Sequence, residues 1–334
     1  MAKNSFNLLK TALIAGLLFC FSLQIFASEG TGEKYNPGAD IIHHIKDDYS
    51  WHLFTAGEFH AEIPLPVILY SKASGLDVFM SSNFHHGTQP YNGYELDHGK
   101  LSRTDGASFY DFSITKNVLA LIVNALILVL VFLSVAKSYT RNKGKAPTGI
   151  QSFVEPIIVF IQDEIAKPNI GPKYARYMPY LLTLFFFILI GNLVGLMPGA
   201  ANMTGNIAVT CVMALITLAL TLGSANKNYW GHIFNPPGVP LALKPIIVPV
   251  EIIGIFTKPF SLMVRLFVAI TAGHIVILSL ISLTFIFHSW SVGVVSSLIV
   301  LFINIIELLV AAIQAYVFTL FSALYIGMAV EEHH

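Results

Sequence analysis

The sequence predicts an all-α protein that crosses a membrane several times, with about five transmembrane helices. Of the 334 residues, 55% are apolar and only 11% are charged, and the mean hydropathy is +0.69. Soluble domains usually carry about a quarter charged residues. Several uncharged stretches are also long enough to cross a membrane, which takes ~20 helical residues. The net charge is zero, and no run of basic residues is long enough to form a surface for nucleic acid. A nucleic-acid partner is therefore not expected.

The N-terminal end has the pattern of a secretory signal peptide. Lys3 and Lys10 flank a short n-region, an apolar stretch follows from Ala12 to Phe26, and a polar run begins directly after Ala27. This order predicts a signal peptide over residues 1–27, with cleavage after Ala27. The alternative is a first membrane anchor, but the apolar stretch is shorter than the ~20 residues that a span needs.

Residues 28–115 differ in composition from the rest of the chain and predict a loop-rich extramembrane segment. They are polar, rich in Gly, Asp, Ser and Tyr, and hold most of the histidines. Residues 59–63 alternate as a short strand would, and Pro64 and Pro66 limit that strand to an edge or a loop. If the signal peptide is present, this segment is exported, and residues 116–334 form the transmembrane domain.

No metal site and no cofactor are expected. The pairs His43–His44 and His85–His86 could bind a metal, but adjacent side chains point in different directions on a helix or a strand. Solvated loop histidines are therefore the expected interpretation. Cys20 and Cys211 lie far apart in apolar segments and lack metal-ligand spacing.

The first clear membrane span is Asn117–Ala136, which carries no charged residue. A cluster of positive charges follows it: Lys137, Arg141, Lys143 and Lys145. Cytoplasmic loops carry an excess of Lys and Arg, so this end of the span is predicted to be cytoplasmic. That orientation agrees with an exported N-terminal segment.

Three helical segments of ordinary length follow. Over Pro147–Lys167, apolar residues are interleaved with acidic and amide residues, which predicts an amphipathic helix on the cytoplasmic membrane face rather than a span. Met178–Met197 and Gly205–Gly223 are uncharged and predict the second and third spans.

Two long apolar segments, Ile246–Phe287 and Trp290–Val330, complete the predicted fold. Each would form a helix about 60 Å long at about 1.5 Å per residue, whereas a hydrocarbon core is only ~30 Å thick. They are expected to form a long, strongly tilted helical hairpin, or else to be kinked or broken. Five spans, counted from the outside, place the C-terminal end in the cytoplasm.

Ionisable residues within predicted spans lie only in these last two segments. Such residues cost about 2.5–3.5 kcal/mol each on insertion scales and usually mark ion or substrate paths. Several repeat at intervals of seven, which places them near one helix face, whereas His274 lies on the side opposite Arg265. The first segment carries Glu251, Lys258, Arg265 and His274, and the second carries Glu307 and Gln314.

The spacing along two antiparallel helices predicts depths for these residues. If Arg265 and Gln314 lie level, His274 is about 13 Å toward the outside at about 1.5 Å per residue. Glu307 is then about 10 Å toward the outside, and Glu251 about 21 Å toward the cytoplasm. A titratable pair, a central cation and an inner acid predict two aqueous half-paths separated by a positive barrier.

Some of these polar residues also have a purely structural interpretation. Lys258 could be a near-interface residue whose ammonium group reaches water. His274 could form a hydrogen bond between helices, and Asn192, in the second span, could tie helices together through its amide. Arg265 and Glu307 are harder to explain in this way, because apolar residues flank both of them.

Short motifs surround these residues. Arg265-Leu266-Phe267 is followed by Ala272-Gly273-His274, and Glu307 is followed by Gln314-Ala315-Tyr316-Val317-Phe318-Thr319. Asn192-Leu193 precedes Leu196-Met197-Pro198, and the chain ends with Met328-Ala329-Val330-Glu331-Glu332-His333 before a last histidine. In combination, the motifs resemble those of the F-type ATP synthase a subunit over roughly residues 110–334.

The resemblance implies a role for each of the central residues. Arg265 would be the stator arginine that faces the rotating ring of c subunits, with Gln314 beside it. His274 and Glu307 would line the outer half-channel, and Glu251 would line the inner one.

The resemblance also implies partners and a location. The partners would be the c-subunit ring, the b-subunit peripheral stalk, other ATP synthase subunits and the lipid bilayer of a bacterial inner membrane. Asn192 and Lys258 would support the site. Many family members have Asn four residues after the arginine, where this chain has Ala269. The chain would not be an enzyme on its own, and it has no GxxxxGK(S/T) phosphate loop.

Other functions fit part of the pattern. A sodium-translocating version of the same subunit is an alternative, because ion selectivity would rest mainly on the ring. A stand-alone secondary transporter would predict an inverted repeat around a midplane site, and the two halves of the sequence show no repeat. A structural scaffold would not account for Arg265 and Glu307.

Overall fold

The computed structural model describes Gly38 and residues 47–331, apart from 57–58, 73–74, 88, 98, 142–145, 198–199, 237–239, 241–242 and 288. The expected signal peptide, residues 1–27, and the pair His43–His44 lie outside these described residues. The chain divides into two compact units. Unit 1 comprises Met1–Leu121, Val194–Asn202 and Ser279–Ser297, and unit 2 comprises Ile122–Leu193, Met203–Leu278 and Leu298–His334.

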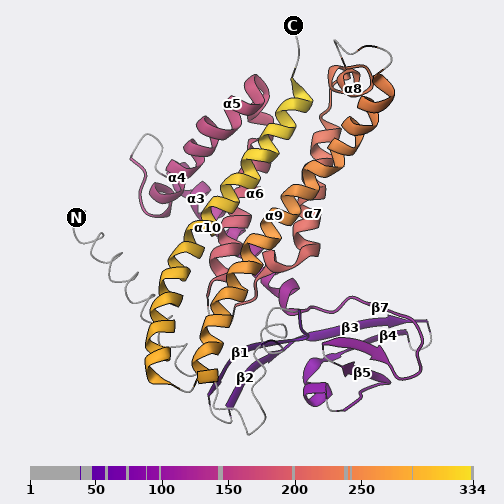
Figure 1. Cartoon of the computed structure of the whole chain (residues 1–334), viewed down its shortest axis with the longest axis vertical. Helices are drawn as coiled ribbons and strands as arrows, with labels where there is room; N and C mark the ends of the chain where they lie inside the picture. Colours follow the sequence, from indigo (N-terminus) through magenta and orange to yellow (C-terminus); the bar gives the residue numbers. More distant parts are fainter. Residues whose placement is uncertain are drawn as a thin grey trace. The chain divides into compact units, whose positions relative to one another are not determined.

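Helices form most of the described chain (Figure 1). The α-helices are α3 (Lys116–Arg141), α4 (Ile150–Phe160), α5 (Lys167–Ile170), α6 (Tyr174–Gly195), α7 (Ile207–Gly223), α8 (Lys227–Phe234), α9 (Lys244–Phe287) and α10 (Trp290–Val330). Shorter helical pieces are η1 (Ser81–Gly87), the π-helical η2 (Ile161–Ala166), η3 (Gly171–Lys173) and η4 (Met203–Gly205).

The helices confirm the predicted multi-pass membrane fold. Among the described residues, four helical stretches are long and apolar enough to cross a membrane: Lys116–Arg141, Ile150–Gly195, Lys244–Thr284 and Trp290–Val330. The pair α7 and α8, bent by 101°, is a candidate for a fifth. Helices α3, α6 and α7 overlap the three shorter spans that the sequence predicts.

The segment predicted to be amphipathic is helical and two-sided. It forms α4, η2 and α5 in succession. Val154, Ile161 and Ile165 are buried, and their spacing of seven and four places them on one helix face. Asp163 and Glu164 are exposed. The segment therefore has the apolar and charged sides that an amphipathic helix requires.

Helices α9 and α10 are the two long helices of the predicted hairpin, and each is continuous over its whole length. Pro249 and Pro259 lie inside α9, although a proline removes a backbone hydrogen bond and often kinks a helix. The sequence left tilting, kinking and a break as alternatives, and the structure excludes a break. The 44 residues of α9 make a helix about 66 Å long, which exceeds an upright crossing of a ~30 Å core.

The core of unit 2 determines which face of α9 turns inward. Leu262, Leu266 and Ile270 recur every four residues on one face of this helix and are buried. They belong to one apolar cluster with Leu181 of α6 and Ile326 of α10. Arg265 precedes Leu266 and therefore lies at the border of this buried face, where it is half-buried.

The described part of residues 28–115 contains more strand than the loop-rich prediction implies. Its strands form three small antiparallel sheets: β1 (Ser50–Ala56) with β2 (Phe59–Pro64), β4 (Gly75–Met80) with β3 (Pro66–Ser71) and β7 (Phe109–Asp111), and β5 (Tyr94–Asp97) with β6 (Lys100–Arg103). The alternating residues 59–63 lie in β2, as predicted. His85–His86 lies in η1.

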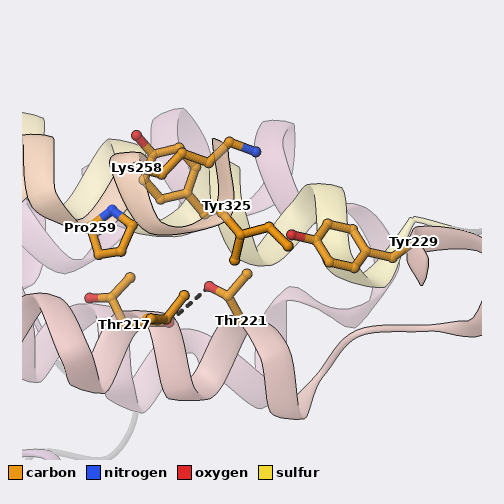
Figure 2. A pocket seen from close by; sticks show the side chains of 8 residues that line it. Thr217, Thr221, Tyr229, Lys258, Pro259 and Tyr325 are labelled. Atoms are coloured by element: carbon orange, nitrogen blue, oxygen red, sulfur yellow. Dashed lines mark hydrogen bonds between the residues drawn. The ribbon is translucent and has the colours of Figure 1, made fainter. Parts of the chain in front are cut away.

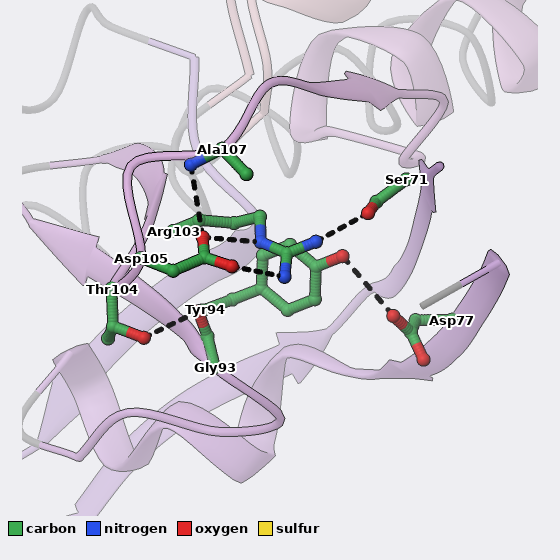
Figure 3. Close-up of polar contacts among 8 residues, drawn as sticks. All are labelled: Ser71, Asp77, Gly93, Tyr94, Arg103, Thr104, Asp105 and Ala107. Carbon is green, nitrogen blue, oxygen red and sulfur yellow. Dashed lines mark hydrogen bonds and ion pairs between the residues drawn. The ribbon is translucent and has the colours of Figure 1, made fainter. Parts of the chain in front are cut away.

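A polar network joins the strands of this region around Tyr94 (Figure 3). The Tyr94 ring is fully buried, and its hydroxyl group donates a 3.2 Å hydrogen bond to Asp77. The Arg103 guanidinium lies 5.3 Å from the centre of that ring and donates two hydrogen bonds to Asp105, of 2.8 and 2.6 Å, and one to Ser71. These bonds connect β3, β4, β5 and β6 through side chains.

Candidate functional site on helices α9 and α10

Helices α9 and α10 are antiparallel neighbours that contact each other through side-chain pairs of unit 2 (Figure 1). As residue numbers rise along α9, those of the α10 partners fall. All but two members of these pairs were predicted site residues. In order along α9, the pairs are Lys258 with Tyr325, Arg265 with Phe321, and His274 with Glu307.

The structure brings His274 and Glu307 together, as the depth argument predicts. His274 Nδ1 lies 3.8 Å from Glu307 Oε1. Glu307 is only 8% exposed, and its other oxygen, Oε2, is buried with no hydrogen-bond partner among the described residues. An imidazole and a carboxylate at this distance can exchange a proton directly after a small movement or through one water molecule.

Gly273 allows Glu307 to approach α9 this closely. A Cβ atom at Gly273 would overlap Oε1 of Glu307 and lie 2.8 Å from its Cδ. Protein interiors are packed too densely for such an overlap, so one side chain or helix would have to move. Gly273 appears in the sequence only as part of a motif, and its spacing to Glu307 gave no indication of this contact.

Arg265 faces an aromatic ring rather than an acid. Its guanidinium lies 4.5 Å from the centre of the Phe321 ring, within the range of a cation–π interaction. Within the part of the chain that the structure describes, no carboxylate forms an ion pair with Arg265. A guanidinium in a helix apolar enough to span the membrane, with no counter-ion among the described residues, is unusual because such charges normally pair.

Gln314 is not the α10 residue that Arg265 contacts. Gln314 is half-buried on α10, seven residues before Phe321 and so on the same helix face. Side chains of a helix lean toward its N-terminus, so the Arg265 guanidinium lies nearer Phe321 than its own Cα does. Among the described contacts, the Arg265 guanidinium donates no hydrogen bond to Gln314. Glu251, fourteen residues before Arg265, is exposed and stands apart from the other site residues.

Lys258 borders a small, mostly apolar cavity between α7, α8, α9 and α10 (Figure 2). Its Nζ lies 5.7 Å from the centre of the Tyr325 ring. The cavity has a volume of about 10 Å³, which is close to the space that one water molecule needs. Thr217, Thr221 and Tyr229 add hydroxyl groups to its lining, and the ring of Tyr229 points toward it.

Buried hydroxyl groups next to this cavity were missed by the sequence analysis. The Tyr180 and Thr217 hydroxyl oxygens are 2.7 Å apart, and those of Thr217 and Ser322 are 3.4 Å apart. Thr217 and Ser322 are fully buried. Thr210, Thr217 and Thr221 share one face of α7 through spacings of seven and four, a signal that would have placed them together.

Asn192 ties three elements together through its amide. Its Nδ2 donates a 3.3 Å hydrogen bond to the carbonyl oxygen of Ala311 in α10, and its Oδ1 accepts a 2.8 Å bond from Thr204 in η4. Asn192 is buried, so these bonds satisfy groups that cannot reach water. Ala311 stands between Glu307 and Gln314, and Asn192 therefore helps to hold the stretch of α10 that carries both.

The described residues offer no cluster for a metal ion, since no three His, Cys, Asp or Glu side chains among them are grouped suitably. The polar residues of α9 and α10 are instead spread along the hairpin. That distribution suits stepwise transfer of a small ion better than coordination at one point.

Comparisons with known proteins divide the chain near the start of α3. The family model for the ATP synthase A chain matches residues 118–327, and a model for a domain of unknown function (DUF8433) matches residues 40–119. Residues 118–327 include every candidate site residue named above.

Individual relatives extend the similarity over almost the whole chain. An ATP synthase subunit a from Chloroherpeton thalassium is 46% identical over 232 residues, covering 67% of this chain and 69% of the relative. An ATP synthase subunit a 2 from Chlorobaculum tepidum is 37% identical over 330 residues, covering 95% and 90%. One from an Anaeromyxobacter species is 43% identical over 321 residues, covering 92% and 74%. With the matching family model and the membrane-spanning helices, these similarities show that the chain belongs to the ATP synthase A chain family.

Proposed function

We propose that this chain is the proton-translocating stator subunit of an F-type ATP synthase, with two aqueous half-channels that lead to the carboxylates of a c-subunit ring. The observation that carries the proposal is the set of contacts that the Arg265 guanidinium makes. This guanidinium lies on a membrane-spanning helix pair, and among the described residues it has an aromatic partner but no carboxylate. Because a lone charge in the bilayer is costly, we infer that its counter-ion belongs to another subunit.

The charge of Arg265 would couple ion flow to rotation. A ring carboxylate that faces lipid must be neutral, because an isolated ion in hydrocarbon is prohibitively costly. Opposite Arg265 the same carboxylate would be ionised, because a nearby cation favours the charged form. Passage of the ring past Arg265 therefore requires proton release on one side and uptake on the other. A potential of 100 mV supplies about 2.3 kcal/mol per charge.

The outer half-channel would contain the pair His274 and Glu307. Their 3.8 Å separation and the burial of Glu307 support a relay in which a proton passes between imidazole and carboxylate. The inner half-channel would begin at the exposed Glu251. Gln314 would contact the ring or Arg265 when the ring is present.

The orientation and partners follow from the same proposal. Residues 1–27 would direct export, residues 28–115 would lie on the outer side of a bacterial inner membrane, and the C-terminal end would be cytoplasmic. The c-subunit ring would contact α9 and α10, and the b-subunit peripheral stalk would hold the chain still. The chain would contribute no catalytic residue for ATP synthesis, which would take place on other subunits.

The test is ATP-driven proton pumping in inverted membrane vesicles that carry Arg265→Ala, with wild type and Lys258→Ala as references. We expect Arg265→Ala to abolish pumping while the complex still assembles, and Lys258→Ala to retain most of it. Lys258 is the matched control, because it is also a half-buried cation stacked on an aromatic ring of α10. Normal pumping by Arg265→Ala would refute the stator role. The same vesicles, assayed with and without sodium, distinguish the two ions: pumping that requires sodium would refute the proton assignment.

A further inference from the structure

One face of the sheet formed by β4, β3 and β7 is apolar and is left uncovered by the residues that the structure describes. Its opposite face belongs to the core of unit 1, where Val67, Leu69 and Phe79 are buried. The uncovered face is built from cross-strand rows, because Tyr70 pairs with both Leu76 and Tyr110 and Ile68 pairs with Val78. Its outermost side chains are largely exposed: Leu76 by 65%, Val78 by 61%, Tyr110 by 62% and Phe112 by 65%.

The acidic side chains of these strands are turned away from the uncovered face. Asp77 lies between Leu76 and Val78 in β4 and accepts a hydrogen bond from Tyr94 on the core side. Asp111 lies between Tyr110 and Phe112 and accepts a 2.5 Å hydrogen bond from the Tyr49 hydroxyl group. The face therefore combines aromatic and aliphatic side chains without a charge. Apolar patches of this kind usually mark an interaction surface.

The sheet is held tightly to the first turn of α3. Phe112 donates a 2.9 Å backbone hydrogen bond to Ile68, and Ile114 donates one of 3.1 Å to Pro66, so β3 remains paired beyond the end of β7. Two residues later, Lys116 donates a 2.9 Å backbone bond to Asp48. Backbone hydrogen bonds therefore fix the segment that joins the sheet to α3. A second link comes from Asp47, whose carboxylate accepts hydrogen bonds of 2.8 Å from Thr115 and 3.0 Å from Asn117.

This connection keeps one end of the uncovered face close to the start of α3. Phe112 is four residues from the start of α3, a distance of at most about 14 Å even for a fully extended chain. Val118, in the first turn of α3, is also exposed, and α3 is one of the helices apolar enough to span the membrane. Exposed apolar side chains therefore occur both on the sheet and in the first turn of α3.

We propose that the face formed by Tyr70, Leu76, Val78, Met80, Tyr110 and Phe112 rests in the lipid interface, on the side of the bilayer where α3 begins. Aromatic side chains are enriched at this depth, where an amphipathic ring contacts both acyl chains and headgroups. A surface of exposed apolar side chains, whose neighbouring acids Asp77 and Asp111 accept hydrogen bonds on the other side of the strands, matches the boundary between headgroups and acyl chains. Lipid is favoured over a protein partner because Phe112 lies only four residues from the start of α3, a helix that is apolar enough to span the membrane. The inference requires that α3 spans the membrane but does not depend on the proposed ion path.

The test places an environment-sensitive fluorophore on a cysteine at Val78 in the full ATP synthase complex, reconstituted into lipid vesicles. Cys20→Ser and Cys211→Ser remove the native thiols. The matched control carries the fluorophore at Glu95, an exposed strand position of β5 in the same unit. A third sample, labelled at Leu76, repeats the measurement on a neighbouring row of the same face. Only complexes that retain the c and b subunits are compared.

We expect phospholipids with brominated acyl chains to quench the label at Val78 and Leu76 but not at Glu95. Aqueous iodide should quench the label at Glu95 far more than the other two. Equal quenching of all three labels by iodide would place the face in water and overturn the proposal. Protection from iodide without quenching by brominated lipid would also overturn it, because the cover would then be a protein surface or another segment of this chain.

Discussion

Gly273 of α9 faces the carboxylate of Glu307 in α10 so closely that a side chain at Gly273 could not share the space. The next residue, His274, meets the same carboxylate through its imidazole, at 3.8 Å. Gly273 thus leaves room for the buried carboxylate, and His274 lies beside it. The carboxylate can lie this close to α9 because Gly273 has no side chain, and the contact between His274 and Glu307 depends on that closeness.

Replacement of Gly273 by alanine should impair ion translocation. The new Cβ would displace the Glu307 carboxylate from His274, and a misplacement of about 1 Å in a reacting group can lower a rate by tenfold or more. We expect ATP-driven pumping to fall on the order of tenfold with normal amounts of assembled complex. Gly254→Ala is the control, because Gly254 lies in the same helix with no atom near its would-be Cβ. Equal activity of both variants would contradict the account.

Exchange of the two members of the pair should preserve more function than either single change. His274→Glu alone would bring two carboxylates together, which cannot both ionise at low cost. Glu307→His alone would leave two imidazoles and no acid. The double variant His274→Glu with Glu307→His restores one of each, so pumping should exceed that of both single variants. A double variant no better than the weaker single one would show that the residues act independently.

Gly327 should be important for stability rather than for translocation. Its would-be Cβ would overlap the carbonyl oxygen of Asn169 in α5 and lie 2.9 Å from the carbonyl carbon. Because these are backbone atoms, they cannot rotate away as a side chain would. Gly327→Ala should destabilise the fold by about 1–3 kcal/mol, the usual cost of overpacking. Thermal dissociation of the detergent-solubilised complex measures this, and Gly223→Ala, which meets no atom, is the control. An unchanged dissociation temperature for Gly327→Ala would contradict the prediction.

Asp105 should make the strands of unit 1 sensitive to acid. Two hydrogen bonds from Arg103 lower the pKa of Asp105 below its ordinary value of 3.8. A lowered pKa in the folded state means that the bond stabilises fully above pH 3.8 and loses its effect as the pH falls through the lowered pKa. Asp105→Asn should therefore increase amide hydrogen exchange in β5 and β6 at neutral pH, and the difference from wild type should vanish in strong acid. A difference that persists unchanged in acid would contradict this account. Because Asp105 is exposed, the effect should be small.

The membrane-spanning helices could be predicted because each one follows from local composition. A stretch such as Asn117–Ala136 must become a helix in a bilayer, since no water is present to satisfy its backbone groups. Hydropathy and helix length likewise predicted the long hairpin of α9 and α10. The strands of residues 47–113 were harder to predict, because their apolar residues are sparse and their pairing joins β3 to β7 across some 40 residues.

The candidate site was predictable in its residue types but not in its contacts. Arg265, His274 and Glu307 stand out because charged groups are rare within apolar segments. Sequence spacing also placed His274 and Glu307 at similar depth. It could not indicate that Phe321 would contact Arg265, or that Thr217, Ser322 and Tyr180 would form a buried hydroxyl cluster, because these residue types are ordinary in such helices.

The sequence by itself determined the class of fold, the order of its long apolar segments, and the few charged residues that lie within those segments. These properties depend on the transfer of each segment from water to lipid, which is a local quantity. Only the tertiary structure decided that Gly273 receives Glu307, that Asn192 holds Ala311, and that one face of a small sheet stays apolar and uncovered. Those contacts depend on the rotation and register of elements far apart in the chain, and many arrangements of the same helices would satisfy the hydropathy pattern equally well.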